Sequence, residues 1–430
     1  MTAGSAGPDV RSFTLVTQYF PPERGAAQVR LGSIVRELSR RRHQVEVVTA
    51  LPNYPIGRIF PGWSHRPMQV GEEGGIRTRR MWIWAAMGSG PGRVANYLSF
   101  GVMSVVGLGS ARRADWVIVE YPTLFGALPA VGLASLRGQR VVVIVADLWV
   151  DSIVEIGTIS DGRAIRILRR AERWMLRRAD VVTAVTEGVR DAVEAKGVDP
   201  HQLAWLPNGA DTEMFAPGPE DPSVRVELGL VEGEHLFLYA GTHGYVHGLE
   251  VVLDAAELLA DAPVRFVLVG DGSEKSSLQR QASERGLTNV TFLAPVAPDE
   301  VARLLRSSTA GLATVRAGDV YKTVRSAKMF PTMSSGIPVI YSGDDEGARL
   351  VAKVGAGFVT APGDGAALAG AVRELIVAPE RRAQLGRAGR DWVLANASWK
   401  QLVGRWLDRL AEFESDSAPG EEPARSGAGG

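Results

Sequence analysis

Residues 241–248 read Gly-Thr-His-Gly-Tyr-Val-His-Gly and are the strongest candidate for chemistry in the sequence. Glycine lets the backbone approach a ligand closely, and the free N–H groups at the start of a following helix attract anions. The spacing matches neither a P-loop nor a dinucleotide fingerprint. We therefore interpret the segment as a diphosphate-binding loop; a glycine-rich turn without a ligand is the alternative. The residues expected to contact the diphosphate are Gly241, Thr242, His243, Gly244 and His247.

A second candidate is the basic segment 322–328, which contains Lys322, Arg325 and Lys328. Cations at this spacing could neutralise a diphosphate, whose negative charge must be stabilised when it leaves in a transfer reaction. A solvated basic face without a ligand is the alternative. We predict that this segment and residues 241–248 converge on one bound pyrophosphate between two domains.

Acidic candidates occur in two places. Asp147 follows the apolar run 141–145, so it is expected at the carboxyl end of a strand, where it could accept a proton or stabilise a developing positive charge. A turn or helix-capping role is the alternative. Glu346 belongs to the run Gly-Asp-Asp-Glu-Gly at 343–347. Adjacent carboxylates can hold a metal, but their position before a helix pattern favours a cap or a contact with sugar hydroxyls.

Strand-length apolar runs alternate with helical patterns along the chain, which is typical of βαβ units and parallel sheets. The expected strands are 13–17, 45–49, 116–120, 141–145 and 181–185 in a first series, and 236–239, 266–269, 290–293, 310–313 and 338–341 in a second. This pattern predicts an α/β protein with two doubly wound, Rossmann-like domains that face each other across a cleft. Such sheets bind ligands at the carboxyl ends of their strands.

The expected boundaries follow the same pattern. They are a disordered N-terminus at 1–10, a first domain at 11–207, a second domain at 208–397, an amphipathic helix at 398–413 and a disordered tail at 414–430. The stretch 207–222 contains proline and glycine and is the best candidate for a hinge.

Composition excludes several classes of function. Lys plus Arg and Asp plus Glu number 48 each, and this balance argues against a protein that binds nucleic acid. The sequence has no cysteine, which excludes disulfides, zinc ribbons and thiol nucleophiles and favours a reducing compartment. The first residues show no signal-peptide pattern. We therefore expect a cytoplasmic protein.

Two segments raise the question of membrane contact. Residues 94–111 carry no charge, but their glycines and polar side chains make them a poor bilayer span, so a buried or surface-docked helix is expected. Residues 163–178 contain seven arginines interleaved with apolar side chains. That pattern fits either contact with anionic lipid heads or an exposed face of a domain helix. Peripheral contact with the inner face of the cell membrane through both segments stays open.

Six short segments, taken in order, resemble family-4 glycosyltransferases, especially the bacterial branch that builds lipid-linked surface polysaccharides and includes fucosamine transferases. They are 17–23, 51–57, 147–149, 207–211, 239–244 and 269–272, and the likeness runs from residue 12 to about 413. The resemblance implies a GT-B fold, retention of anomeric configuration, and no obligatory metal or other cofactor. It also implies a nucleotide-sugar donor in the second domain, an acceptor mainly in the first, and a final helix, 398–413, that crosses back to the first domain.

Site residues follow from the resemblance position by position. Gly25 would lie beside the donor phosphates, Asp147 would face the cleft, Lys328 would be the phosphate cation, and Glu346 would precede the helix that faces the sugar. The donor side would also include Gly270 and Asp271, and the acceptor side Arg30, Tyr54 and Trp149. Several positions depart from the family. Many relatives carry Arg or Lys at the positions of Thr242 and His247, and the family's paired glutamates fall at Thr323 and Pro331. The second glutamate normally holds the donor ribose, so the nucleotide stays open.

The predicted function is transfer of a sugar, with a hexosamine as first candidate, from a UDP-linked donor to a lipid-linked or other glycan acceptor. Asp147 is the predicted catalytic residue. The alternatives on the same fold are transfer to a soluble natural-product acceptor, epimerisation of a sugar nucleotide, coupling of a nucleotide-activated ring to an amine, and a non-catalytic scaffold.

Overall fold

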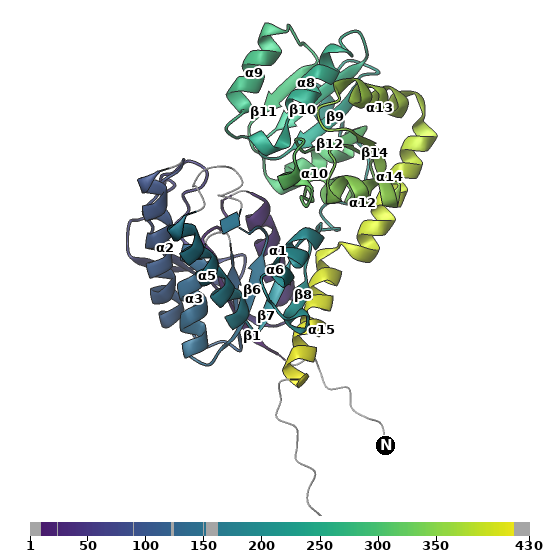
Figure 1. The fold of residues 1–430 in the computed structure, drawn as a ribbon. Coiled ribbons are helices and arrows are strands. Elements are labelled where there is room, and N and C mark those ends of the chain that lie inside the picture. The colour runs from purple at the N-terminus through teal and green to yellow at the C-terminus, as the bar shows by residue number, and fades with distance from the viewer. Residues whose placement is uncertain are drawn as a thin grey trace, which may run out of the picture.

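The structure is a computed structural model that describes residues 10–23, 25–88, 90–121, 124–148, 150–151 and 162–416. It contains two separate sheets, each covered by helices on both faces (Figure 1). The first sheet ends at Trp205 and the second begins at His235. This is the two-domain α/β arrangement expected from the alternating pattern. The termini predicted to be disordered at 1–9 and 417–430 lie outside the described residues, as does Trp149.

The first sheet has eight strands in the order β3-β4-β2-β1-β5-β6-β7-β8. All neighbouring pairs are parallel except β3 with β4. The strands are β1 (Ser12–Val16), β2 (Gln44–Ala50), β3 (Met68–Glu73), β4 (Ile76–Met81), β5 (Trp116–Glu120), β6 (Arg140–Val145), β7 (Val181–Ala184) and β8 (Leu203–Trp205). The central strands are buried on both faces, which explains why they read as continuous β-branched runs.

Different helices cover the two faces of this sheet. One face packs against α2 (Pro91–Ser110), α3 (Leu124–Leu136) and α5 (Arg163–Arg178), and the other against α1 (Ala26–Arg40) and the final helix. The helix α6 (Glu187–Ala195) follows β7. Segment 163–178 is therefore one helix as expected, and segment 94–111 forms most of α2. No helix in the described part of the chain is long and apolar enough to cross a bilayer.

The second sheet has six parallel strands in the order β11-β10-β9-β12-β13-β14. They are β9 (His235–Ala240), β10 (Val264–Val269), β11 (Val290–Leu293), β12 (Ala310–Thr314), β13 (Val339–Ser342) and β14 (Gly357–Thr360). The helices are α7 (Pro222–Glu227), α8 (Glu250–Glu257), α9 (Lys275–Glu284), α10 (Pro298–Arg306), α11 (Met329–Ser334), α12 (Glu346–Val354), α13 (Gly365–Val377), α14 (Pro379–Asn396) and α15 (Trp399–Asp416).

The last helix, α15, crosses back to the first domain (Figure 1). Its Trp406, Leu407 and Leu410 are buried in the core that also contains Phe13 of β1, and Trp406 Nε1 donates a hydrogen bond to Thr183 Oγ1 at 3.0 Å. The helix extends to Asp416, so the expected end at 413 is too early: Glu414 pairs with Arg11 and Arg140 and continues the contact.

The sequence pattern missed four strands, for physical reasons. Strands β3 and β4 are charged, and their arginines are held by acids: Arg79 pairs with Glu46 at 2.6 Å and Arg80 pairs with Glu73 at 2.5 Å. The antiparallel edge strand β3 is largely exposed and needs no hydrophobic run. The inner strand β4 is mostly buried, and its arginines are tolerated there because these acids pair with them. Strands β8 and β14 are short and lie at the sheet edges, where an apolar run is not needed.

Candidate active site

The loops after β9 and β10 pack directly against each other at the carboxyl edge of the second sheet. A Cβ atom at Gly270 would lie 1.9 Å from the Gly241 carbonyl oxygen, and one at Gly272 would lie 2.4 Å from the His243 carbonyl oxygen. The φ angle of Gly270 is 144°, which side chains disfavour. Asp271 between them is exposed and accepts the Gly272 N–H at 2.8 Å. Close packing between the two loops is therefore enough to require glycine at positions 270 and 272, whether or not a ligand binds there.

Lys328 lies against the same loop. A Cβ atom at Gly241 would lie 2.2 Å from Lys328 Cε, and Lys328 Nζ lies 5.0 Å from the centre of the Tyr239 ring. The residue is partly buried, and desolvation lowers the pKa of its ammonium group to about 8. No carboxylate of the described residues pairs with it. The loop at 241–248 thus lies beside a cation that no acid in the described ranges neutralises.

The two histidines of the loop are held in the neutral state. Burial, helped by the charges of Lys275 and Lys328, lowers the pKa of His243 to about 4. Burial together with the Lys328 charge lowers the pKa of His247 to about 3. His243 is completely buried and packs near Tyr239 and Phe292. Its two ring nitrogens are buried and have no hydrogen-bond partner among the described residues, whereas His247, Gly244 and the exposed Thr242 reach the surface.

The spacing of the basic segment 322–328 predicts three cations at one site. The structure does not show this arrangement. Lys322 is exposed and pairs with Asp319 at 2.7 Å. Arg325 pairs with Glu346 at 3.1 Å and lies over the Trp205 ring at 5.5 Å. Only Lys328 approaches the glycine loop, because the start of α11 carries it back toward β9. The predicted convergence of the two segments therefore holds through one residue.

Glu346 joins the two domains. Its carboxylate accepts the backbone N–H of Glu187 at 3.1 Å and of Gly188 at 2.7 Å, at the start of α6 in the first domain. A negative charge is stabilised at this end of a helix. The neighbouring Asp345 caps α12 by accepting the Ala348 N–H at 3.0 Å. The acidic run 343–347 thus acts as a helix cap and a domain contact, as the capping alternative expected.

Asp147 lies just past the carboxyl end of β6 and is exposed. A buried network holds the chain nearby: Lys196 Nζ contacts Asp151 and Glu172 at 2.6 Å each, and Glu172 also hydrogen-bonds the Tyr121 hydroxyl. Burial raises the pKa of Tyr121, and the charges of Glu172 and Asp147 raise it further. Asp147 therefore lies exposed at the carboxyl end of β6, next to a segment that these contacts hold in place.

Gly25 precedes α1, at the edge where β1 ends. The loop before it is fixed by Glu23, whose Oε1 accepts the N–H groups of Asn53 and Tyr54 at 2.8 Å each. Burial raises the pKa of Glu23 to about 7, against the lowering effect of these hydrogen bonds. The sequence reasoning passed over Glu23; its place inside the segment 17–23 was the available signal.

The predicted acceptor residue Arg30 has a structural role instead. It is buried, pairs with Glu120 at 3.1 Å, and contacts Asn208 Oδ1 at 3.3 Å. Glu120 also accepts the Thr17 hydroxyl at 2.6 Å. Arg30 therefore ties the ends of β1 and β5 to the segment that connects the domains.

Tyr54, the other described acceptor candidate, belongs to a polar and aromatic cluster that sequence reasoning missed. The Tyr54 and Tyr19 rings lie 5.5 Å apart. Arg93 donates to the Tyr19 hydroxyl at 2.9 Å and to the Tyr97 hydroxyl at 2.8 Å. Arg93 and Tyr97 lie in the first turns of α2, which the sequence showed only as the border of an uncharged segment.

Within the described residues, no group of three or more His, Asp or Glu side chains could hold a metal ion together. The positive charge near the glycine loop comes from Lys328 and from Lys275, whose Nζ donates to the Gly270 carbonyl at 2.6 Å.

Comparison with known proteins gives the same assignment for both halves. Residues 25–209 match the glycosyl transferase 4-like domain, and residues 220–392 match the glycosyl transferases group 1. The colanic acid biosynthesis glycosyl transferase WcaI of Escherichia coli strain K12 is 30% identical over 298 residues, which cover 67% of this chain and 72% of WcaI. A GDP-mannose-dependent phosphatidylinositol monomannoside mannosyltransferase of Mycolicibacterium smegmatis is 28% identical over 57% of this chain and 65% of that enzyme.

Solved structures agree on the fold. HepE of Anabaena in complex with UDP-glucose has a TM-score of 0.69 and 17% identity, and the match covers 94% of this chain and 100% of HepE. Sequence similarity and fold thus point the same way. The chain belongs to the family-4 GT-B glycosyltransferases of the bacterial polysaccharide-biosynthesis type, which use a nucleotide-sugar donor.

Proposed function

We propose that this protein transfers a sugar, of hexosamine type, from a UDP-linked donor to a lipid-linked acceptor, with retention of configuration and without a metal. The observation that carries the proposal is the position of Lys328. This partly buried cation lies against Gly241 and pairs with no carboxylate of the residues that the structure describes, at the carboxyl edge where doubly wound sheets bind ligands. A donor diphosphate would supply the missing negative charge.

The chemistry follows from that charge. The Lys328 ammonium group and the loop N–H groups stabilise the negative charge that grows on the departing nucleoside diphosphate. The acceptor hydroxyl then attacks C1 from the face that the diphosphate leaves, which preserves the anomeric configuration. Asp147, at the end of β6, stabilises the positive charge that develops on the sugar.

The nucleotide is the least constrained part of the proposal. UDP is supported by HepE, whose structure contains UDP-glucose, whereas the mycobacterial relative depends on GDP-mannose. Pro331 lies in α11 where the family resemblance places a ribose-binding glutamate, so its side chain offers no acceptor for a ribose hydroxyl. A panel of UDP-, GDP- and TDP-linked sugars is therefore the first measurement.

A lipid-linked acceptor is supported by α2. Its outward side chains Val94, Leu98, Val102 and Val106 recur at helical spacing and are each at least 46% exposed. The same helix begins with the Arg93 and Tyr97 cluster beside Tyr54. One helix thus offers a polar end for an acceptor glycan and an apolar stripe for its lipid.

The test is donor turnover in matched lysine variants. Lys328→Gln should reduce kcat/KM by about 100–1,000-fold, the usual effect of removing one preorganised donor. Lys322→Gln is the control, because that lysine is exposed and paired with Asp319. A chelator should leave turnover unchanged. Equal activity of the two variants would remove the proposed donor site.

The product pattern separates the rival reactions. Nucleoside diphosphate that appears only with an acceptor supports transfer, and interconversion of the donor alone supports an epimerase. Nucleotide binding without turnover across all donors and acceptors supports a non-catalytic scaffold.

A further inference from the structure

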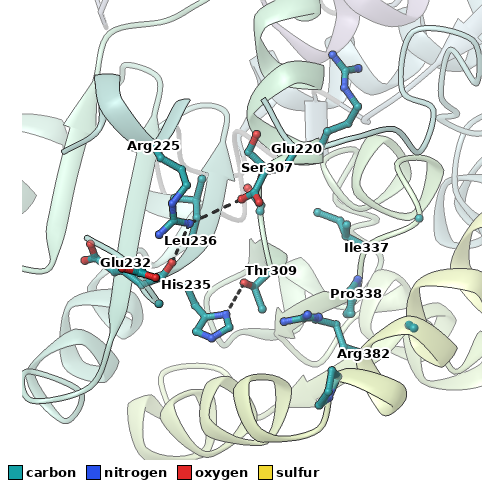
Figure 2. A pocket seen from close by; sticks show the side chains of 17 residues that line it. Glu220, Arg225, Glu232, His235, Leu236, Ser307, Thr309, Ile337, Pro338 and Arg382 are labelled. Carbon is teal, nitrogen blue, oxygen red and sulfur yellow. Dashed lines mark hydrogen bonds and ion pairs between the residues drawn. The ribbon is translucent and has the colours of Figure 1, made fainter. Parts of the chain in front are cut away.

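A cavity opens on the opposite side of the second domain from the glycine loops. It has a volume of about 610 Å³ and lies at the amino ends of β9, β12 and β13, whereas the donor loops follow the carboxyl ends of the strands (Figure 2). Its walls come from α7, the end of α10, residues 307–309 and the start of α14. Ligand pockets commonly occupy roughly 300–1,000 Å³. The size therefore suits a small molecule that is not the donor.

The lining of this cavity contains positive charge that protein acids do not neutralise. Arg382 of α14 extends toward Thr309 and His235 in Figure 2, and no side chain of the described residues hydrogen-bonds or ion-pairs with its guanidinium group. Arg306 also lines the cavity without an acid partner among those residues. Unpaired guanidinium groups match the geometry of phosphate and carboxylate oxygens.

The nearby acids are largely engaged elsewhere. Glu234 pairs with Arg265 at 2.9 Å and accepts the Val231 N–H at 3.0 Å. Glu220 lies 3.8 Å from Arg225, whose guanidinium group also donates to two backbone carbonyls. Glu232 is exposed. The lining carries three arginines and three glutamates, and among the described residues only Arg306 and Arg382 of these arginines have no acid partner.

His235 lines the same cavity. Partial burial is the main cause that lowers the pKa of its imidazole, the charges of Arg382 and Arg225 lower it further, and the charge of Glu220 raises it. The ring shares a hydrogen bond with Thr309 Oγ1 at 3.1 Å. A neutral imidazole, a hydroxyl and two guanidinium groups thus surround the same hollow. Ile337, Pro338 and Leu236 add an apolar wall beside them.

We propose that this cavity binds a small phosphate monoester, with Arg382 holding the phosphoryl group and the apolar wall contacting the organic part. Arg225 belongs to α7, which follows the connection between the domains, and Arg382 belongs to α14, which leads into the crossing helix. A bound phosphate ester would therefore contact both α7 and α14, which lie next to the two places where the chain crosses between the domains. Its binding would stabilise the folded protein.

The experiment uses the full chain with Lys328→Gln, so that phosphates cannot act through the donor site. Thermal unfolding and calorimetry are run with AMP, glucose 6-phosphate and inorganic phosphate. At saturating ester the Tm should rise by about 2–4 °C. Adding Arg382→Gln should weaken binding at least about tenfold. Adding Arg381→Gln should not, because this neighbour on α14 does not line the cavity and hydrogen-bonds Gln384.

Two results would overturn the site. One is no response of the Lys328→Gln protein to any ester, and the other is an equal response in the Arg382→Gln and Arg381→Gln variants. Inorganic phosphate that binds as tightly as both esters would overturn the role of the apolar wall.

Discussion

At the scale of single residues, the protonation of Lys328 is expected to depend on whether an anion is bound beside it. Desolvation holds the pKa of its ammonium group near 8, well below the ordinary value for lysine, because no acid of the described residues compensates its charge. A donor diphosphate would reverse that shift by favouring the protonated form. Lys328 thus links donor binding to pH.

The pH profile of kcat/KM should report this lysine. The free enzyme must be protonated to bind a diphosphate, so kcat/KM should be constant at neutral pH and fall as pH rises through about 8. The corresponding fall in kcat should occur at higher pH, because the bound anion raises the pKa. Lys328→Arg should remove the inflection, since arginine stays charged. A wild-type profile that is flat from pH 7 to about 10 would contradict the assignment.

Asp147 should affect turnover and leave donor binding unchanged. Asp147→Asn keeps the shape but removes the negative charge, so kcat should fall by about 100–10,000-fold while the Kd of UDP in calorimetry stays within twofold. Asp344→Asn is the control, because this carboxylate is exposed in the loop before α12. Unchanged kcat in the Asp147 variant would remove the proposed role.

At the scale of elements, the contact between α6 and the 322–346 region sets how the two domains meet. Glu346 holds the first N–H groups of α6, and Thr323 packs so closely on Gly188 that an added Cβ would lie 2.1 Å from Thr323 Cγ2. The family resemblance places a glutamate at the position of Thr323. This chain instead uses the position for a close contact between its domains.

A double-mutant cycle tests that contact. Gly188→Ala should displace the domains and lower kcat/KM by up to about a hundredfold, the effect expected of a 1 Å misplacement. Thr323→Gly alone should change activity little, and the double variant should recover most of the loss, because the clash is removed. Small-angle scattering should show the displacement in Gly188→Ala. Full activity of Gly188→Ala would show that the contact does not position the site.

At the scale of the whole molecule, α2, α3 and α5 form one side of the first domain. The exposed arginines of α5 surround Trp174, which is 50% exposed, and α2 carries the apolar stripe defined by Val94, Leu98, Val102 and Val106. Basic and aromatic side chains on the same side of a domain as an exposed apolar stripe are typical of proteins that bind an anionic membrane surface. A lipid-linked acceptor would then reach the protein from that side.

Vesicle binding checks this surface. Replacing Arg166, Arg170 and Arg173 with Gln should weaken binding to phosphatidylglycerol vesicles about a hundredfold, at about 1 kcal/mol for each arginine. Replacing Arg280, Arg381 and Arg387, which are exposed on the second domain, is the control with the same change in charge. Binding of the wild type should also decrease with salt. Equal binding of both triple variants would contradict the proposed surface.

Much of the fold followed from local pattern. Continuous apolar runs predicted the central strands of both sheets, because strands buried on both faces need apolar side chains at most positions. The charged strands β3 and β4 escaped the same reasoning, since their stability comes from ion pairs with distant acids such as Glu46. Arg30 was misassigned for the same reason: its partner Glu120 lies 90 residues away in sequence.

The sequence by itself determined the two-domain α/β architecture and the position of the glycine-rich segment 241–248 between a strand and a helix, because strand periodicity and glycine spacing are local properties. Only the tertiary structure decided which charges are free. Arg325 and Glu346 neutralise each other beside α6, Lys322 pairs with Asp319, and Lys328 has no acid partner in the described part of the chain. Charge compensation depends on distances between side chains that chain folding alone brings together.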